Sequence, residues 1–374
     1  MDQFSEYELG TVCSRLSSGK GISAKDIFSE GKYPVYGGNG LRGYTDTCNF
    51  EGDCAIIGRQ GAFCGNVRYF SGKAYMTEHA VVCCANEYHN TRYLAYLLST
   101  MNLGRLSVQS AQPGLSVKTL SKQLVRLPSL EQQNKVAAVL STLDAKIAAN
   151  EKINDNLQQQ AYAYYVQLFV ENADPTWRVG TISDLGTIVG GGTPSKAKPE
   201  YYKENGIAWI TPKDLSVDKS KFIAHGENDI SDLGYRNSSA TMMPAGTVLF
   251  SSRAPIGYIA IASNEVTTNQ GFKSVIPHPE IGTAFVYYFL IHNLPLIESK
   301  ASGSTFKEVS GSTMKSVEAV VPDSDTIAKF NDFCCPIFEM QANLEQENRN
   351  LAALRDSLLP RLMSGDIDIS DIDI

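Results

Sequence analysis

The sequence predicts an α+β fold: two mixed, β-rich domains separated by two long antiparallel helices that form an intramolecular coiled coil. Three observations lead to this prediction. First, the chain is duplicated, since residues 8–12 return as 184–188 and residues 127–157 return in one register as 321–351. Second, apolar residues recur at helical spacing over about 40 residues in each copy. Third, short apolar runs alternate with glycine-rich turns ahead of those stretches. The chain is therefore expected to be a pseudo-two-fold repeat.

The 374 residues are enough for two domains that each bury a core of their own. The repeat unit, a domain followed by a helix, is far longer than the units of solenoids and propellers. The expected segments are a first domain at 1–128, a first spacer helix at 129–172, a second domain at 173–322, a second spacer helix at 323–365 and an acidic disordered tail at 366–374.

Both domains are predicted to be mostly β, each with one helix near its end. The first domain has glycine-rich turns at 37–40 and 61–65 between its apolar runs, and the second repeats the order of elements. The predicted elements are strands at 54–57 and 80–83 with a helix at 91–101, and strands at 248–250 and 258–261 with a helix at 284–292.

The two long stretches alternate apolar residues by three and four, which is typical of a coiled-coil seam. The predicted seam contains Leu140, Leu143, Ile147, Asn154 and Leu157 in the first helix, and Ile337, Leu344, Asn348 and Leu351 in the second. Arg355 is the one charged residue in the second seam. Pro336 is expected to end or kink the second helix near its start, and Gly365 is expected to stop it.

A helix of about 40 residues is roughly 60 Å long, too long to be covered by one small domain. Two such helices in one chain most simply pair antiparallel. Asn150 with Asn154, and Asn348 in the other copy, would put polar layers into the seam, and such layers commonly fix register. The alternative is a pair of ordinary amphipathic helices, each packed on its own domain. The same polar positions recur in both copies, which favours the paired helices.

The formal net charge of −7 argues at first against a nucleic-acid partner. The charge is uneven, however. Residues 323–374 carry 4 Lys/Arg against 11 Asp/Glu, whereas residues 1–128 carry 13 against 10 and residues 173–322 carry 13 against 14. The domains are close to neutral, so affinity for DNA has to come from local basic patches or from a second subunit.

The N-terminal residues lack the basic and then apolar run of a signal peptide, and the longest apolar stretch is too short to span a bilayer. A soluble cytoplasmic protein with no membrane contact is therefore expected. The eight cysteines contain no Cys-x-x-Cys pair, which favours free buried thiols over zinc or disulfides. A metal site built from Cys54, Cys64 and His79 is the less favoured alternative.

Motifs for catalysis are missing from the sequence. It holds no G-x-x-x-x-G-K-[ST] phosphate loop, no H-x-x-x-H pair, and no Asn-Pro-Pro-aromatic or Asp-Pro-Pro-aromatic tetrapeptide of the kind that holds a flipped adenine for methylation. The chain is therefore expected to be non-catalytic and to bind no cofactor or metal of its own.

Seven short segments carry a resemblance to a known family. They are 33–40, 58–67 and 77–80 in the first half, and 190–194, 209–211, 251–257 and 268–272 in the second. Each is weak alone, but together, in order and duplicated, they are specific. Over essentially its whole length the chain resembles the specificity (S) subunits of type I restriction-modification systems.

The resemblance implies a role and partners. An S subunit reads a bipartite, asymmetric site in double-stranded DNA with two target-recognition domains, one for each half-site, while its helices hold the halves apart. It directs two methyltransferase (M) subunits and the restriction/translocase (R) subunits to that site. S-adenosylmethionine, ATP and Mg are implied for those partners and not for this chain.

Base edges are commonly read by Arg, Asn, Gln and Lys side chains, and phosphates by Lys beside Ser or Thr. The candidate DNA-binding residues are Arg42, Arg59, Gln60, Arg68 and Lys118 in the first half, and Lys213, Ser252, Arg253, Asn269, Gln270, Lys273 and Lys307 in the second. Lys118 and Lys307 are the expected phosphate contacts. Any of these side chains could instead be solvated or support its own loop, as Asn269 and Gln270 could by bonding turn backbone.

Comparison of the two halves places Arg59 opposite Arg253, and Glu78-His79 opposite Asn269-Gln270. Three alternative functions stay open at this stage. The chain could be an orphan recognition module with no active partner, a coiled-coil protein whose β domains bind protein, or a nuclease with a fused recognition domain. The lack of a metal-binding acidic cluster outside the tail counts against the nuclease.

Overall fold

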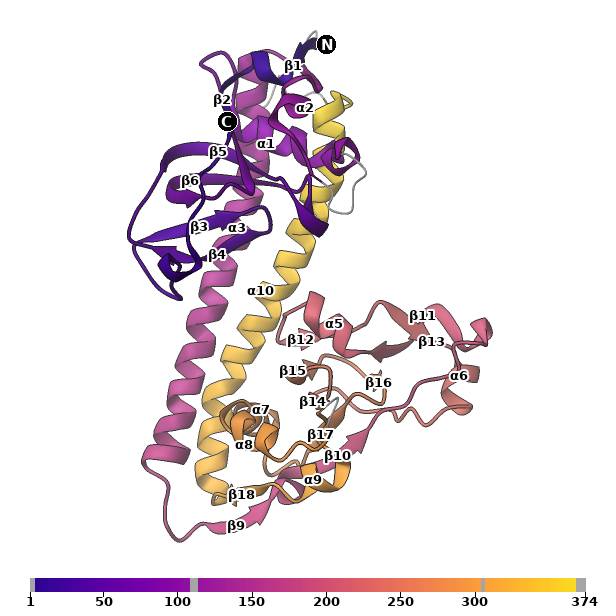
Figure 1. The fold of residues 1–374 in the computed structure, drawn as a ribbon. Helices are drawn as coiled ribbons and strands as arrows, with labels where there is room; N and C mark the ends of the chain where they lie inside the picture. Colours follow the sequence, from indigo (N-terminus) through magenta and orange to yellow (C-terminus); the bar gives the residue numbers. More distant parts are fainter. Residues whose placement is uncertain (1–3, 108–113, 304–306, 368–374) are drawn as a thin grey trace. The chain divides into compact units, whose positions relative to one another are not determined.

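The computed structural model describes residues 4–107, 114–303 and 307–367 (Figure 1). The chain forms two compact units: unit 1 contains Met1–Ile147 and Asn350–Ile374, and unit 2 contains Ala148–Arg349. We call the part of unit 1 that precedes the first long helix the first domain. The part of unit 2 between the two long helices is the second domain. The predicted disordered tail lies outside the described residues from position 368 onward.

The first domain is built on a six-stranded sheet in the order β2-β7-β5-β6-β3-β4. The strands are β2 (Cys13–Ser18), β3 (Tyr33–Gly37), β4 (Gly40–Thr45), β5 (Phe50–Gly58), β6 (Val67–Met76) and β7 (Ala80–Ala85). The β3–β6 pair is parallel and the other neighbours are antiparallel. The predicted strands at 54–57 and 80–83 lie at the centre of this sheet, where side chains on both faces are buried.

The second domain has a five-stranded sheet in the order β10-β17-β14-β15-β12. Its strands are β10 (Gly186–Gly190), β12 (Phe222–Ile223), β14 (Val248–Ser252), β15 (Ile256–Ala262) and β17 (Lys273–Pro277). The β12–β15 pair is parallel and the others are antiparallel. Strand order and strand direction thus match β2-β7-β5-β6-β3 of the first domain. The duplication seen in the sequence is therefore a duplication of the fold.

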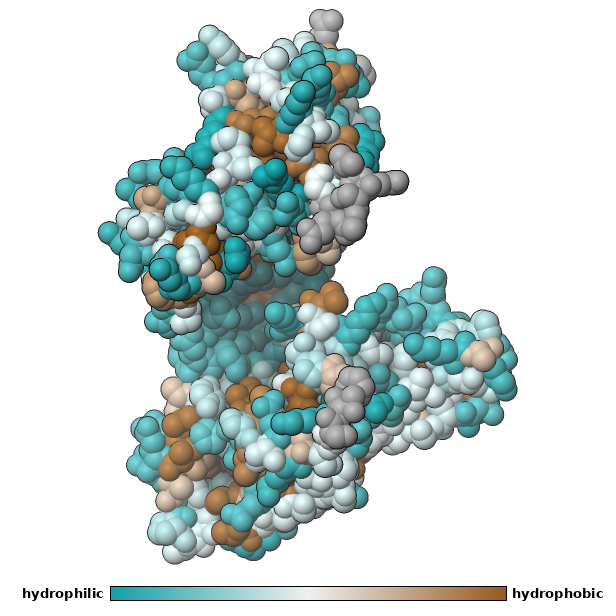
Figure 2. Space-filling view, viewed as in Figure 1, coloured by the Kyte–Doolittle hydropathy of each residue, from teal (hydrophilic) through white to brown (hydrophobic). Residues whose placement is uncertain are grey.

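The second domain also carries a small additional sheet in the order β13-β11-β16, which has no counterpart in the strand order of the first domain. Its strands are β11 (Tyr202–Ile210), β13 (Asn228–Ile230) and β16 (Thr267–Thr268). Two short helices accompany it, α5 (Pro212–Val217) and α6 (Asp232–Arg236). Figure 2 shows a mostly hydrophilic surface over this insert, so the insert adds polar surface to the second domain.

The first and last strands of each domain also pair in the same way in both copies. A two-stranded antiparallel ribbon joins β1 (Ser5–Glu8) to β8 (Leu124–Leu127), and another joins β9 (Arg178–Thr181) to β18 (Glu318–Val321). The predicted domain helices are α1 (Thr91–Thr100) and α7 (Thr283–His292). The shorter helices are α2 (Val117–Ser121), α4 (Ile182–Leu185), α8 (Leu294–Ser299) and α9 (Gly311–Lys315), with single turns at Leu9–Thr11, Ala24–Asp26, Gly61–Phe63, Leu103–Leu106 and Pro199–Tyr201.

The two long helices are α3 (Leu130–Val166), which continues as a π turn over Gln167–Glu171, and α10 (Ser324–Ser364). Both contribute residues to both units. Neither they nor any other helix of the described residues is long and apolar enough to cross a membrane. α10 ends where Gly365 takes a φ of +82°, as predicted from the sequence.

The helices pair antiparallel along the predicted seam. In unit 1, Arg355 Nη1 lies 2.9 Å from Asp144 Oδ1, so the charged residue of the seam is neutralised across it. In unit 2, Asn150 Nδ2 donates to Asn348 Oδ1 at 2.8 Å, which forms the polar layer. The predicted seam residues Leu140, Leu143, Ile147, Asn154, Leu157, Ile337, Leu344, Asn348 and Leu351 are all buried or half-buried.

Pro336 does not end the second helix, because α10 runs through this residue, so that part of the prediction was wrong. A proline inside a helix costs about 3 kcal/mol through its missing N–H and the clash of its ring with the preceding turn. Here the neighbouring turns are held by tertiary packing, since Phe330, Cys334 and Ile337 are buried in the core of the second domain. Burial of those side chains offsets the local cost.

The ends of the long helices also complete the cores of the domains. Val136 and Leu140 of α3 and Leu362 of α10 belong to the core cluster of the first domain. Phe169, from the π turn after α3, and Phe330 of α10 belong to that of the second domain, where their rings meet edge-on at 5.2 Å. The ends of the two long helices are therefore packed on the domains, as the alternative interpretation expected. The stretches between those ends form the coiled coil.

All eight cysteines are free thiols. Burial raises the pKa of Cys54 to about 12 and also raises that of Cys84. Cys48 and Cys335 are exposed, so the expectation of buried thiols holds for only part of the set.

One buried cation was not anticipated from the sequence. Lys221 precedes β12, is only 7% exposed, and donates from Nζ to Gln341 Oε1 of α10 at 2.5 Å. Its ammonium lies over the rings of Tyr287, Tyr288 and Phe338, at 4.9, 5.4 and 4.3 Å from their centroids. Burial lowers the pKa of Lys221 to about 7, against an opposing effect of the nearby Glu345. Lys221 thus joins the second domain to α10 within unit 2.

Replacement of Lys221 by methionine is expected to favour the folded chain most at and below neutral pH, where the buried amine of the wild type is charged, and less as the pH rises. Because burial lowers the pKa of Lys221 only in the folded chain, the unfolded chain holds more protons from about pH 7 upward, and wild-type stability gains from rising pH. The Lys221→Met variant lacks this contribution. Its advantage over wild type should shrink by about 1–2 kcal/mol between pH 7 and pH 9 in urea denaturation.

Lys219→Met is the matched control, because Lys219 is exposed in the same loop. This control is measured at the same pH values, so that the effect of removing a buried lysine is compared with that of removing an exposed one. A pH-independent advantage of Lys221→Met would contradict the prediction.

Candidate nucleic-acid interface

Polar side chains gather at the same sheet edge in both domains, where a central strand ends and its neighbour begins. In the first domain this is the edge after β5 and before β7, and in the second it is the edge after β14 and before β17. Each edge borders an open cavity. Because the two edges occupy equivalent positions in two copies of one fold, we treat them as two versions of the same candidate site.

Glycine shapes both edges through a close backbone crossing. A Cβ atom on Gly19, just after β2, would lie 2.0 Å from Met76 O, and a Cβ atom on Gly191, just after β10, would lie 2.1 Å from Asn269 O. No side chain fits at either place. The crossing is secured by the next residue, since Gly192 N donates to Thr268 O at 2.8 Å. The glycine-rich segment at 190–194 therefore has a structural reason for its composition.

Backbone hydrogen bonds define which residues of the two edges are equivalent. Arg59 N donates to His79 O at 3.0 Å in the first domain, and Ser252 N donates to Gly271 O at 2.7 Å in the second. Arg59 is therefore equivalent to Ser252, not to Arg253. The carbonyl groups of these two residues give the same equivalence. Arg59 O accepts from Leu115 N at 2.9 Å, and Ser252 O accepts from Val309 N at 3.0 Å.

The equivalence expected from the sequence was thus shifted by one residue. Gln60 takes the place of Arg253, and Glu78 takes the place of Gln270. Isolated antiparallel bridges support this shifted equivalence, because Gln60 pairs with Gly114 and Arg253 pairs with Glu308. The sequence comparison aligned like residue types, whereas the hydrogen bonds align the backbone.

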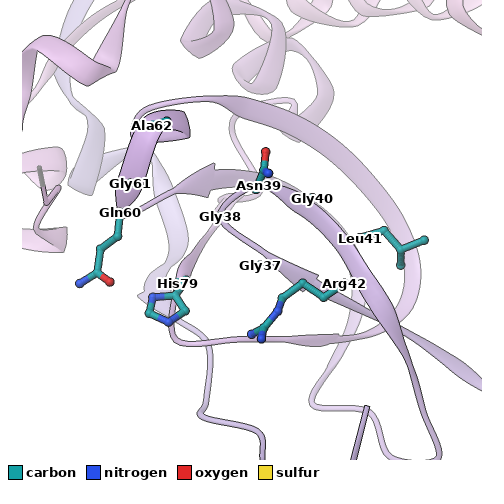
Figure 3. A pocket seen from close by; sticks show the side chains of 10 residues that line it. All are labelled: Gly37, Gly38, Asn39, Gly40, Leu41, Arg42, Gln60, Gly61, Ala62 and His79. Atoms are coloured by element: carbon teal, nitrogen blue, oxygen red, sulfur yellow. The ribbon is translucent and has the colours of Figure 1, made fainter. Parts of the chain in front are cut away.

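The cavity of the first domain has a volume of about 790 Å³. It is lined by Gly37, Gly38, Asn39, Gly40, Leu41, Arg42, Gln60, Gly61, Ala62 and His79 (Figure 3). In Figure 3 the side chains of Arg42, Gln60 and His79 extend on one side of the ribbon and Asn39 points the other way. No carboxylate is among these lining residues.

Two of the predicted residues near this cavity are engaged with the protein itself. Arg59 Nη1 approaches Ser18 Oγ at 3.4 Å, and Arg68 lies against the β3–β4 turn, where a Cβ atom on Gly40 would be 2.5 Å from its Nη1. Arg68 also faces Tyr36, whose pKa is raised chiefly by burial. His79 also lines the cavity, and its Nε2 lies 3.2 Å from Glu78 Oε1.

The cavity at the corresponding edge of the second domain measures about 460 Å³. Its lining residues are Thr193, Lys196, Trp209, Thr211, Pro212, Lys213, Glu227, Asn228, Arg253, Ala254, Asn269, Gln270 and Gly271. Several of these belong to the additional sheet and its helix α5. Lys196, Glu227 and Asn228 were missed because nothing in the sequence shows that the insert folds back to this edge.

Three basic side chains at this edge of the second domain are paired with carboxylates. Lys213 Nζ lies 2.5 Å from Glu227 Oε2, and this contact raises the pKa of Lys213. Glu308 lies 3.5 Å from both Arg253 Nη1 and Lys273 Nζ. Two of the basic side chains that line the second cavity, Lys213 and Arg253, are therefore partly neutralised by neighbouring carboxylates.

A buried carboxylate supports this wall. Asp214, 9% exposed, accepts from Thr211 N at 2.7 Å and Thr211 Oγ1 at 2.6 Å, which caps α5. Its other oxygen accepts from Glu227 N at 2.8 Å. The same side chain thus fixes α5 and the segment that carries Glu227.

The remaining predicted residues lie outside the two cavities or hold the loops. Ser252 is fully buried and donates from Oγ to Gly271 O at 3.1 Å. Asn269 Oδ1 accepts from Gly271 N at 2.8 Å, so this amide supports its turn. Lys118 is exposed on α2, and Lys307 is exposed beside residues outside the described part of the chain.

Gln270 is held by the loop of the glycine-rich segment, since its side-chain oxygen accepts from Thr193 Oγ1. Cys54, Cys64 and His79 do not form a metal site, and within the described residues no group of three or more His, Cys, Asp or Glu side chains could hold a metal ion.

Residues 1–159 and 175–332 match the family model of the type I restriction modification DNA specificity domain. The chain belongs to this family. The two matched stretches correspond to the two copies of the fold, and both include the sheet edges described above. The family resemblance expected from the sequence is confirmed.

Individual relatives agree with this assignment. The chain is 37% identical over 177 residues to the specificity subunit of the type I restriction enzyme MjaIX of Methanocaldococcus jannaschii, which is 47% of this chain and 41% of the relative. It is 25% identical over 331 residues to the HindI specificity subunit of Haemophilus influenzae, 68% of this chain and 71% of that one. The match therefore spans less than half of the MjaIX subunit.

The fold is also found in a solved structure. The S subunit of a type I restriction-modification system from M. genitalium superposes with a TM-score of 0.66 at 16% identity and covers 96% of both chains. This similarity shows a shared fold.

Asp214→Ala is expected to loosen the wall of the second cavity and to lower the free energy of unfolding by about 2–3 kcal/mol. The substitution removes a helix cap and leaves the backbone N–H groups of Thr211 and Glu227 without their acceptor. Urea denaturation measures this loss. Asp184→Ala is the matched control, since Asp184 forms the same capping box with Thr181 in α4 but is far more exposed. Its effect should be smaller, and equal losses would contradict the support role of Asp214.

Proposed function

We propose that this chain is the non-catalytic subunit of a type I restriction-modification complex that reads a bipartite, asymmetric site in double-stranded DNA. The single observation that carries the proposal is the pair of equivalent sheet edges with unlike polar side chains. One fold, used twice with different side chains, suits a target with two different halves. Membership of the type I specificity family supports the same conclusion.

In this proposal each domain presents its cavity to one half-site. Base edges in the major groove offer distinct patterns of donors and acceptors, and Arg and Gln side chains can engage two of them at once. Arg42 and Gln60 are the proposed readers in the first domain, and Lys213, Arg253 and Gln270 are those in the second. Arg59, Arg68, Asn269, Ser252 and Lys273 would support the loops. Lys118 and Lys307 are proposed to contact phosphates, which position the protein without specifying sequence.

The proposed partners are two methyltransferase (M) subunits and the restriction/translocase (R) subunits, which would supply S-adenosylmethionine, ATP and Mg chemistry. The paired helices α3 and α10 are proposed to hold the two domains at a fixed separation. Because the chain has a net charge of −7, we expect weak DNA binding alone and tighter binding in the complex, where partners add basic surface. A cytoplasmic location fits this role.

Exchange of residues 1–128, the proposed first domain, for that of another family member should change one half-site and leave the other intact. The reason is that each domain carries its own reading edge. Genome-wide mapping of methylated adenines in the host, with the wild-type, exchanged or deleted gene, measures the site. The deletion should abolish the modification. A change in both halves together, or methylation that persists without the gene, would refute the proposal.

A matched insertion of seven residues in each long helix, near 147–150 in α3 and near 348–351 in α10, should lengthen the unread gap between the half-sites. Seven residues add about 10 Å along a helix, or roughly three base pairs. The same methylation mapping reads the gap. Leu143→Ala, which weakens the seam without lengthening it, should leave the gap unchanged. An unaltered gap in the insertion variant would remove the helices as the spacer.

Copurification separates this proposal from a coiled-coil protein whose domains bind protein, and from an orphan recognition module. A specificity subunit should purify with M chains and confer sequence-specific methylation only in that complex. Recovery of the chain without M subunits would favour the alternatives.

A further inference from the structure

The backbone equivalence of the two edges singles out one pair of positions. Gln60 and Arg253 lie just beyond the end of a central strand, β5 and β14 respectively, and each forms an isolated antiparallel bridge with the segment that returns from the domain helix. Both line their cavities. Two side chains that occupy the same place in the same fold would meet the same part of a bound duplex.

From this pairing we infer that Arg253 reads a guanine in one half-site and that Gln60 reads an adenine at the corresponding place of the other. The inference rests on the proposed function and names the bases that this position selects. A guanidinium donates two parallel hydrogen bonds to O6 and N7 of guanine, whereas a carboxamide donates to N7 and accepts from N6 of adenine. Neither side chain satisfies the other's base as well.

The surroundings of the two positions differ in the way this chemistry requires. Arg253 has a long flexible side chain, and its Nη1 lies 3.5 Å from Glu308 Oε2, with both side chains 36% exposed. The carboxylate holds the guanidinium while leaving part of it open to a ligand. At the equivalent place the first domain has Gly114, so the shorter Gln60 has no such partner there. Glu308 is thus a positioning residue for Arg253.

A simpler role for the Arg253–Glu308 pair would be that of a surface ion pair, worth little to stability and nothing to recognition. Another would be a phosphate contact, which weakens binding on all sequences alike. Only base reading makes the identity of the side chain change the identity of a base pair. The experiment therefore reads sequence as well as affinity.

The gene in the host is replaced by variants carrying Arg253→Gln, Arg253→Lys or Gln60→Arg, and methylated adenines are mapped genome-wide. Wild type should give a bipartite site with a guanine in one half and an adenine in the other at matching places. Arg253→Gln and Arg253→Lys should reduce methylation of that site by about 10- to 100-fold and relax the guanine position only. Gln60→Arg should shift the other half-site from adenine toward guanine.

Arg236→Gln removes an exposed arginine of α6 that lies outside both cavities, and it should leave the site unchanged. Glu308→Gln should relax the guanine position partly, because Arg253 keeps its fork but loses its support. Thermal melting of each purified complex confirms that the variants are folded.

A wild-type site without a guanine in either half would overturn the inference, as would an unchanged site in both Arg253 variants. So would a uniform loss of methylation on all sequences, because that result marks a phosphate contact. Absence of any sequence-specific methylation with the wild-type gene would overturn the proposed function itself, and the two failures are thereby distinct.

Discussion

The constraint on which this structure depends is that neither domain completes its own core. Each needs apolar side chains from both long helices, and the two sets lie at opposite ends of each helix. Val136 and Leu140 near the start of α3 serve the first domain, and Phe169, just beyond its end, serves the second. A fully buried side chain of this size contributes about 1.5–3 kcal/mol. The helices are therefore part of the fold of both domains and not linkers between them.

Polar groups in the helix pair follow from the same constraint. A pairing held only by leucines and alanines can slip by a turn, since apolar contacts have little directional preference. Asn150 and Asn348 restrict it, because their hydrogen bond of 2.8 Å exists in one register. The Asp144–Arg355 pair acts likewise in unit 1. A defined register matters for a protein in which the length of a helix pair is proposed to set a distance.

The sequence predicted the duplication, the central strands, the domain helices and the seam, because each depends on local periodicity or on repetition. It failed where long-range packing decides. Pro336 sits inside α10 because buried neighbours hold its turns, and Lys221 is buried because three rings surround it. Neither fact is visible in a window of neighbouring residues. The candidate site was predicted in part, since Arg42, Gln60, Arg253 and Gln270 do line the cavities.

The misplaced equivalence between the two halves shows what backbone geometry adds. Aligning Arg59 with Arg253 makes the two edges look alike and hides their difference. The backbone hydrogen bonds of Arg59 and Ser252 shift the alignment of the two halves by one residue. The carboxamide of Gln60 then corresponds to the guanidinium of Arg253.

A duplicated domain that kept the same reader in both copies would select two identical half-sites. Divergence at a position where the backbone is held fixed is the simplest way for one fold to acquire a second specificity. Beside Gln60 and Arg253 the edge is shaped by main-chain hydrogen bonds of Arg59 and Ser252, which a change of side chain at the next position does not remove. The same separation of backbone from side chain explains why the glycine crossings at Gly19 and Gly191 are alike while the residues beside them are not.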